Sequence, residues 1–265
     1  MRRFTIAPER IAGDRVAFDM DETRHLVRVL RLGPGDLVTA SDGAGHDYTV
    51  RIESGGERAT GTILGVAAGR AESPFAVTLI QGVPKGDKME AIVRATTELG
   101  VARIVPALTE RTIVRLEPGR WRERARRWQR VAREAAKQCG RAVVPDVESP
   151  VPLGDAMARA GHAPLRLCLW EGDAPPLVTV LLASDTPASV SVLVGPEGGL
   201  ARAEVDAAVA AGFRIASMGP RILRTETAGP AVIAVLQSRF GDLGTAQRVP
   251  NLGGGGAAVA PADVE

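Results

Sequence analysis

One stretch decides the fold, Val190-Ser191-Val192-Leu193-Val194-Gly195-Pro196-Glu197-Gly198-Gly199-Leu200. Its first five residues form an almost uninterrupted apolar strand, which is typical of a parallel sheet covered on both faces. The loop that follows has three glycines, which let a backbone approach a ligand closely. Ligands of open α/β sheets bind at the carboxyl ends of strands. Taken alone, however, the loop fits a tight strand-to-helix turn with a solvated Glu197 equally well.

A second loop of the same kind follows it, Met218-Gly219-Pro220-Arg221-Ile222-Leu223-Arg224-Thr225-Glu226-Thr227-Ala228-Gly229-Pro230. It lies between a strand expected at 214–218 and a helix expected over about 228–240, with Thr227 as the N-cap. Its two arginines and its glutamate are crowded between buried elements. Charged side chains in such a place must be paired with an opposite charge or take part in binding or catalysis. Alone, a capped loop with surface charges is the simpler interpretation. Two glycine-bearing loops at strand ends of one domain favour a shared ligand site.

The composition changes near Ser73-Pro74, and beyond it expected strands alternate with expected helices. This alternation predicts an α/β domain over residues 74–244. Residues 1–71 contain short strand candidates separated by turn residues, which predicts a small β-barrel. The glycine- and alanine-rich tail, 245–265, has little to bury and is expected to be disordered. The strands expected in the larger domain are 76–80, 104–107, 165–170, 190–194 and 214–218, and the helices are 88–99, 120–138, 203–211 and 228–240.

The helix expected at 120–138 is rich in arginine. Trp121, Ala125 and Trp128 recur at helical spacing and predict one apolar face, with arginines on the others. A solvated amphipathic helix is the simpler interpretation of such a charge run. Acidic residues are too few here for i,i+4 pairing to neutralise the arginines, and unpaired arginine clusters favour phosphate. The tryptophans are expected in the core rather than stacked on bases.

Composition excludes several classes of function. The 265 residues carry a net charge of only +2, so any positive surface must come from local segregation of charge. Two cysteines and three scattered histidines predict neither a disulfide framework nor a metal site. No dinucleotide fingerprint, P-loop or nucleophile elbow is present. Free thiols and the lack of a signal peptide or a membrane-length apolar run favour a cytoplasmic protein.

Taken together, the two loops resemble the ribosomal RNA small-subunit methyltransferase E family, which methylates N3 of a uridine in 16S ribosomal RNA. The resemblance runs in order from about residue 2 to residue 240. It also rests on Arg24–Arg31, Pro84–Glu90, Glu98–Val101 and Glu134–Arg141. It implies a SPOUT-type α/β domain with a parallel sheet and a C-terminal trefoil knot, preceded by a small PUA-like RNA-binding β-barrel. It further implies S-adenosylmethionine as the cofactor and a homodimer with the cofactor site near the subunit interface.

The resemblance assigns site residues by position. The residues implied for the cofactor walls are Leu193, Val194, Gly195, Gly198, Gly199, Met218, Gly219, Leu223, Thr225 and Ala228. The charges expected at the reacting centre are Arg224, Glu226 and Glu197. The candidates for RNA contact are Arg2, Arg3, Arg24, His25, Arg28, Arg31, Lys85, Lys88, Arg126, Lys137, Gln138 and Arg141. His25 fits a structural histidine equally well.

The implied chemistry gives these charges roles. Uracil carries a proton at N3, so the nitrogen must lose it to become a good nucleophile. We expect Arg224 to stabilise the resulting anion and Glu226 or Glu197 to accept the proton. The expected partner is 16S ribosomal RNA or the small ribosomal subunit.

Three other functions remain open at this point. The first is a SPOUT methyltransferase that acts on another RNA, such as transfer RNA or the large ribosomal subunit. The second is a non-catalytic RNA-binding or ribosome-assembly factor that kept the fold. The third is a small-molecule methyltransferase, which the arginine-rich helix and the N-terminal barrel disfavour.

Overall fold

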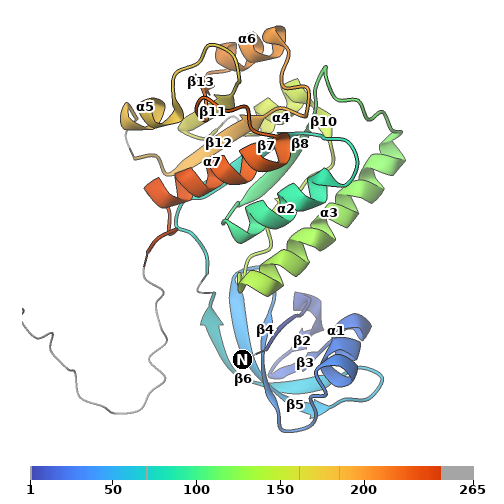
Figure 1. Cartoon of the computed structure of the whole chain (residues 1–265). Coiled ribbons are helices and arrows are strands. Elements are labelled where there is room, and N and C mark those ends of the chain that lie inside the picture. The colour runs from blue at the N-terminus through green and yellow to red at the C-terminus, as the bar shows by residue number, and fades with distance from the viewer. Residues whose placement is uncertain (1, 70, 161, 185, 246–265) are drawn as a thin grey trace, which may run out of the picture.

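The computed structural model describes residues 2–69, 71–160, 162–184 and 186–245. They form two parts, a small β-domain and a larger α/β domain that lies above it in Figure 1. The predicted disordered tail falls outside the described residues except for Thr245. None of the described helices is long and apolar enough to cross a membrane.

The β-domain is a curled six-stranded sheet in the order β1-β4-β5-β6-β3-β2. It packs around Phe4, Phe18 and Leu26, all fully buried. Asp19 caps the short helix by accepting a hydrogen bond of 2.8 Å from the Glu22 backbone N–H. The elements are β1 (Arg3–Thr5), β2 (Ile11–Ala12), β3 (Arg15–Ala17), α1 (Met20–Arg24), a π-helical turn (His25–Val29), β4 (Leu37–Ser41), β5 (His46–Ser54) and β6 (Thr60–Ala68).

The larger domain is built on a seven-stranded sheet in which each pair of neighbouring strands is parallel. Its order is β10-β8-β7-β12-β11-β13, with β9 also paired to β8. The strands are β7 (Ala76–Gly82), β8 (Arg103–Leu108), β9 (Asp146–Val147), β10 (Val151–Pro152), β11 (Leu165–Leu169), β12 (Ser189–Val194) and β13 (Arg214–Ala216). The helices are α2 (Lys88–Glu98), α3 (Pro118–Cys139), α4 (Leu153–Ala160), α5 (Leu177–Leu182), α6 (Arg202–Ala210) and α7 (Thr225–Phe240).

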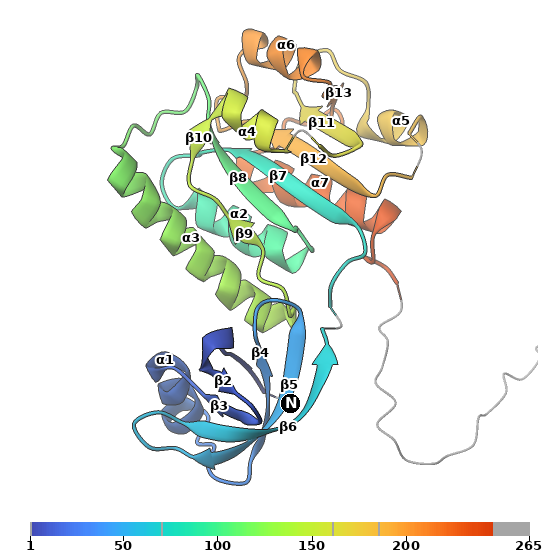
Figure 2. The ribbon, with the colours of Figure 1, turned by 180° about the vertical axis from the view of Figure 1, so that it is seen from behind.

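Helices cover both faces of this sheet, as the apolar strands predicted. Val192 and Val194 of β12 pack in the core shared with α2, α3, α5 and α7, whereas Leu193 faces α4 and α6 in a second core. Figure 2 shows α4 and α6 on the face opposite α7. The α/β fold with a parallel sheet is therefore confirmed. The trefoil knot and the domain boundaries at 1–71 and 74–244 stay predictions.

The start of the last helix differs from the prediction. Helix α7 begins at Thr225, three residues before the expected start, and Arg224 is its N-cap with φ −64° and ψ 151°. The prediction that Thr227 caps the helix is therefore wrong. The cap has no side-chain hydrogen bond, so the sequence lacked the usual side-chain oxygen signal. The strand before it ends at Ala216, so the loop lies at residues 217–224, earlier in the chain than expected.

Ion pairs and hydrogen bonds join the two domains. Lys137 at the end of α3 contacts both carboxylate oxygens of Glu22 at 2.7 Å. Arg3 of β1 pairs with Asp47 and also donates to the carbonyl of Gly140. The linker residue Glu72 accepts bonds from Arg141 and from the backbone N–H groups of residues 142 and 143. These contacts connect the C-terminal end of α3 to the β-domain.

Candidate active site

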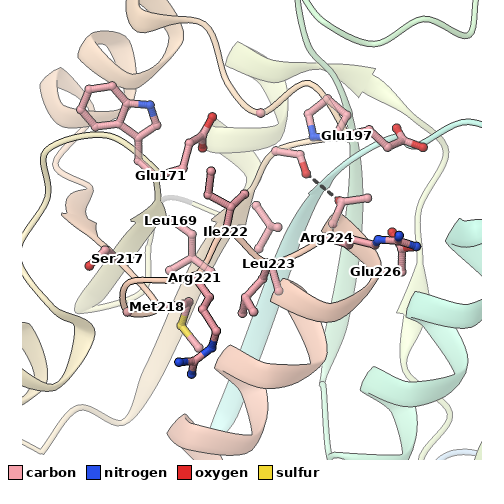
Figure 3. A pocket seen from close by; sticks show the side chains of 18 of the residues that line it. Leu169, Glu171, Glu197, Ser217, Met218, Arg221, Ile222, Leu223, Arg224 and Glu226 are labelled. Carbon is pink, nitrogen blue, oxygen red and sulfur yellow. Dashed lines mark hydrogen bonds between the residues drawn. The ribbon is translucent and has the colours of Figure 1, made fainter.

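A cavity of about 540 Å³ opens where strands β11, β12 and β13 end. The first loop, residues 195–201, joins β12 to α6, and the second loop, residues 217–224, joins β13 to α7. Both line the cavity, together with residues 169–172 after β11 and with Lys88. Figure 3 shows side chains from the second loop and from the start of α7 pointing into this space. The two loops singled out in the sequence therefore meet in one site.

The first loop is folded tightly on itself. A Cβ atom built on Gly195 would lie 2.8 Å from the carbonyl carbon of Gly199, so only glycine fits there. Gly199 has a φ of +69°, a conformation that glycine adopts without strain, and its N–H donates to the Pro196 carbonyl at 2.9 Å. At Gly195 and Gly199 this wall therefore presents backbone to the cavity.

The second loop gives the opposite wall an apolar surface. Met218, Leu223 and Ala228 line the cavity, with Leu169 from the end of β11. The side chain of Ile222 at the rim is 82% exposed. Backbone on one side and apolar side chains on the other suit a flat, partly apolar ligand of nucleoside size.

A cluster of three charges lies at one side of the cavity. The Nζ of Lys88 is 3.0 Å from Glu197 Oε1 and 3.6 Å from Glu226 Oε2. The backbone N–H of Lys85 also donates to Glu197. Burial raises the pKa of Glu197, but hydrogen bonds from backbone N–H groups and from Lys88 outweigh it, so the pKa lies below its ordinary value. The hydrogen bond to Glu197 in turn raises the pKa of Lys88.

These environments distinguish the two carboxylates. Glu197 stays ionised at neutral pH and is a weakened base, because its charged form is held by several donors. Glu226 Oε2 is buried, has no hydrogen-bond partner in the described part of the chain and meets Lys88 Nζ only at 3.6 Å, longer than the 3.0 Å contact of Glu197. An unsatisfied buried acceptor beside a cavity is available to a donor on a ligand. Glu226 is therefore the better placed of the two to accept a proton.

Two arginines of the second loop also line the cavity, Arg221 and Arg224. Both are exposed, and neither guanidinium has a hydrogen-bond or ion-pair partner among residues 2–245 where these are described. Figure 3 shows Arg224 beside Glu226, whereas the side chain of Arg221 points away, towards Met218. A cation and a carboxylate thus lie together at one end of the cavity.

Eight of the ten expected cofactor residues line the cavity. The other two do not, since Leu193 is buried against the opposite face of the sheet and Gly198 lies against Arg111, which donates to its carbonyl at 2.6 Å. The wall formed by residues 169–172 was missed. The sequence pattern that could have predicted this wall is Trp170-Glu171-Gly172, a third glycine-bearing segment directly after an apolar strand.

The residues expected to contact RNA lie in different environments. Arg24, Arg28, Arg31, Lys85, Arg126 and Gln138 are exposed, as is Arg2, which donates to the Leu30 carbonyl. Arg3 and Lys137 are held in the domain junction. Lys88 belongs to the charge cluster of the cavity. His25 lies 3.4 Å from Lys137 Nζ with its ring against Phe4, so both of its interpretations stand.

Arg141 has a structural environment that does not suit contact with RNA. It is only 6% exposed, and it donates to the carbonyls of Thr97 and Val101 and to Glu72. Every nitrogen of its guanidinium therefore has a protein acceptor. We remove Arg141 from the RNA-contact residues for this reason.

Replacing Arg141 with alanine should lower the free energy of unfolding by about 3 kcal/mol, the lower end for breaking a buried ion pair, because Glu72 is partly solvated. Denaturant unfolding measures this loss. The same substitution at Arg126, which is exposed, is the control and should change stability by less than about 0.5 kcal/mol. Equal stability of the two variants would contradict the structural role.

The exposed face of α3 carries an arginine stripe, defined as Arg122, Arg126, Arg130 and Arg133. All four are exposed and have no ion-pair partner in the described ranges, whereas the neighbouring Arg127 pairs with Glu90 at 2.7 Å. The stripe spans about 16 Å at 1.5 Å per residue. Trp121 and Trp128 are buried on the opposite side, as predicted. Helix α3 carries this stripe from the larger domain down to the β-domain (Figure 1).

Comparison with known proteins gives matches over both domains. Residues 71–237 match the family model of an RNA methyltransferase domain, and residues 18–64 match that of an RNA methyltransferase PUA domain. The ribosomal RNA small subunit methyltransferase E of Synechocystis is 36% identical over 240 residues, covering 89% of this chain and 77% of the relative. The protein of the same name from Bacillus subtilis is 29% identical, covering 78% of this chain and 84% of the relative.

Solved structures agree in fold. A methyltransferase from Legionella pneumophila in complex with S-adenosylmethionine superposes with a TM-score of 0.82 at 31% identity, covering 91% of this chain and 98% of that one. The ribosomal RNA small subunit methyltransferase E from Neisseria gonorrhoeae, also bound to S-adenosylmethionine, gives a TM-score of 0.81 at 34% identity, covering 91% and 99%.

Proposed function

Since the chain belongs to the ribosomal RNA small subunit methyltransferase E family, we propose that it methylates N3 of one uridine in 16S ribosomal RNA. The enzyme depends on S-adenosylmethionine. The observation that carries the proposal is the cavity of about 540 Å³ between a backbone wall and an apolar wall. This volume lies in the range of ligand pockets, and its glycines suit the close approach of a nucleoside cofactor.

The residues that would hold the cofactor are those of the two walls. Gly195 and Gly199 offer backbone groups, and Met218, Leu223 and Ala228 offer apolar contact to an adenine ring. When bound, S-adenosylmethionine supplies an electrophilic methyl group on a sulfonium sulfur. The chain itself has to orient the uracil and remove its N3 proton.

In this proposal, Arg224 and Glu226 act on the uracil. Glu226 accepts the N3 proton, because its Oε2 is buried and has no hydrogen-bond partner within the described residues. The Arg224 guanidinium stabilises the negative charge that then develops on the uracil oxygens. Lys88 holds Glu197 ionised beside them, which leaves Glu197 to shape the site rather than to take the proton.

The experiment that tests this function is mass spectrometry of ribosomal RNA from cells with and without the gene. We expect one N3-methyluridine of 16S RNA to disappear when the gene is deleted and to return with the intact gene. Retention of every such nucleotide would contradict the proposal. Loss of a modification from transfer RNA or from the large subunit would instead support the alternative substrate.

Calorimetry separates the enzyme from a non-catalytic assembly factor. We expect S-adenosylmethionine to bind the purified protein at micromolar to millimolar concentration, in the range typical of enzyme substrates. A protein that binds ribosomal RNA but no cofactor at millimolar concentration would be an assembly factor.

The arginine stripe of α3 gives the RNA a phosphate-binding surface. Its guanidinium groups are unpaired in the described structure and lie on a helix that reaches the β-domain. Lysines and arginines that neutralise phosphates release counterions, which makes RNA affinity depend on salt. The other expected contacts, Arg24, Arg28 and Arg31, would extend this surface over the β-domain.

The double substitution Arg126→Ala with Arg130→Ala should weaken RNA binding and reduce the slope of log K against log salt by about 1.4, since each phosphate contact on a single strand contributes about 0.7. Titrations at several salt concentrations measure the slope. Arg127→Ala is the control, because Arg127 is already paired with Glu90. If the control changes the slope as much as the double variant, the stripe is not the phosphate surface.

We also propose a homodimer in the cytoplasm, where ribosomal RNA is found. Val178 and Leu182 of α5, Ile222 of the second loop and Val235 of α7 are large apolar side chains that remain 42–82% exposed. Burial in a subunit interface would remove this apolar surface from water. Light scattering on the purified protein should give twice the chain mass of 27.8 kDa, and a monomer would contradict the proposal.

A further inference from the structure

Gln81 lies beneath the cavity, at the carboxyl end of the strand between β8 and β12. It is the penultimate residue of β7, pairs in register with Val194 and is 0% exposed. It does not line the cavity itself. No role follows for it from the sequence motifs or from the mechanism above.

This one side chain connects both walls of the cavity. Gln81 Nε2 donates to Thr225 Oγ1 at 2.9 Å and to the neighbouring Gly82 carbonyl at 3.0 Å, and it approaches the Gly195 carbonyl at 3.4 Å. The Thr225 hydroxyl donates in turn to the same Gly195 carbonyl at 2.7 Å, so the three groups form a closed triangle. Gly195 begins the first loop and Thr225 follows the second.

The acceptor end of the same amide is not satisfied. Gln81 Oε1 is buried without a hydrogen-bond partner among the described residues, and a Cβ built on Gly229 would lie only 3.3 Å from it. An unsatisfied buried acceptor is costly, so this glutamine gains little net stability over an apolar side chain of the same length. Its contribution is therefore geometric, through the two walls that its donor group reaches.

We propose that Gln81 is a positioning residue that sets the spacing of the two loops that bind the cofactor. The proposal rests on the proposed function in one respect, that the cavity binds S-adenosylmethionine. It does not depend on which RNA is methylated. Without the amide donor, the Gly195 carbonyl keeps only the Thr225 hydroxyl among the donors of the described residues, and the start of α7 is free to move relative to the first loop. Affinity for the cofactor should fall, because the preorganised spacing of the walls is lost.

The test compares two buried glutamines of the same domain. Gln81→Met keeps the length of the side chain and removes its donor. Gln237→Met is the matched control, because Gln237 is also 0% exposed and donates to the Phe75 and Gly100 carbonyls, but outside the cavity lining. The measurements are the melting temperature, the Kd for S-adenosylmethionine by calorimetry and the separate kcat and KM values.

We expect Gln81→Met to raise the Kd and the cofactor KM about tenfold, the equivalent of one or two lost hydrogen bonds, with a small change in melting temperature. Gln237→Met should lower the melting temperature and leave the Kd unchanged. Thr225→Val should act like Gln81→Met and be non-additive with it, whereas Thr225→Ser should retain nearly normal affinity. The Thr225 variants test the same bonds if Gln81→Met does not fold.

An unchanged Kd in Gln81→Met, or equal Kd changes in the two glutamine variants, would overturn the proposal. Additive effects of Gln81→Met and Thr225→Val would also overturn it. These readouts concern cofactor binding alone. A wild-type protein that binds S-adenosylmethionine but leaves 16S RNA unmethylated would refute the proposed substrate. The comparison of cofactor affinities in the Gln81 and Gln237 variants would still test the positioning role of Gln81.

Discussion

Replacing Arg224 with alanine should lower kcat by about 10²–10³-fold, the usual cost of removing one group that stabilises a developing negative charge. The guanidinium lines the cavity beside Glu226 and has no partner in the described structure, so it is free to contact the substrate. Stability should not change, because Arg224 caps α7 through its backbone and makes no side-chain cap bond. Cofactor binding should be largely retained.

Single-turnover methylation and calorimetry on the same preparations measure these two effects. Arg221→Ala is the matched control, since Arg221 belongs to the same loop and lines the same cavity but points towards Met218. Unchanged turnover in Arg224→Ala would remove Arg224 from the reacting centre. Equal losses in both variants would show a general effect of positive charge in the loop.

Replacing Gly195 with alanine should raise the Kd for S-adenosylmethionine by about tenfold to a hundredfold, equivalent to the 1–3 kcal/mol cost of overpacking a tight site. The added Cβ would lie 2.8 Å from the carbonyl carbon of Gly199 and 3.0 Å from the Leu200 nitrogen. Both are backbone atoms, which cannot rotate away, so the first loop must open and the backbone wall of the cavity must move.

Gly198→Ala in the same loop is the control. Its Cβ would meet Cβ of Arg111 at 3.3 Å and Cδ at 3.4 Å, outside the cavity lining, so a shift of a few tenths of an ångström away from the cavity relieves the contact. Calorimetry should therefore give nearly normal affinity for the control and a large loss for Gly195→Ala. Equal affinity in the two variants would mean that the close approach at Gly195 does not shape the cofactor site.

The sequence predicted the central elements of the larger domain because their patterns are local. The apolar run of β12 and the helical spacing of Trp121 and Trp128 reflect burial. Burial of this kind can be predicted from the apolar pattern within each segment alone. Strands β9 and β10 were missed because two residues carry no periodicity. The start of α7 was misplaced because its cap lacks a side-chain oxygen.

The site residues show the same limit. The two glycine loops could be found from their positions after strands, whereas the roles of basic residues could not. Lys137 and Arg141 pair with acids 115 and 69 positions away, and no spacing rule connects such partners. Without the fold, a structural arginine and an RNA-binding arginine are both positive charges in an arginine-rich segment. Gln81 could not be identified for a similar reason, because its partners in the cavity walls are 114 and 144 positions distant.

The strand order also determines when this protein can become active during its synthesis. The strands of the β-domain all come from residues 3–68, so this part can fold as soon as it leaves the ribosome. In the larger domain, by contrast, the central strands β7 and β12 are covered by α7, which ends at Phe240. A nascent chain therefore exposes the apolar residues beneath α7 and lacks one wall of its cavity until α7 has left the ribosome. The cofactor site is therefore complete only after α7 has been synthesised and has packed on the sheet.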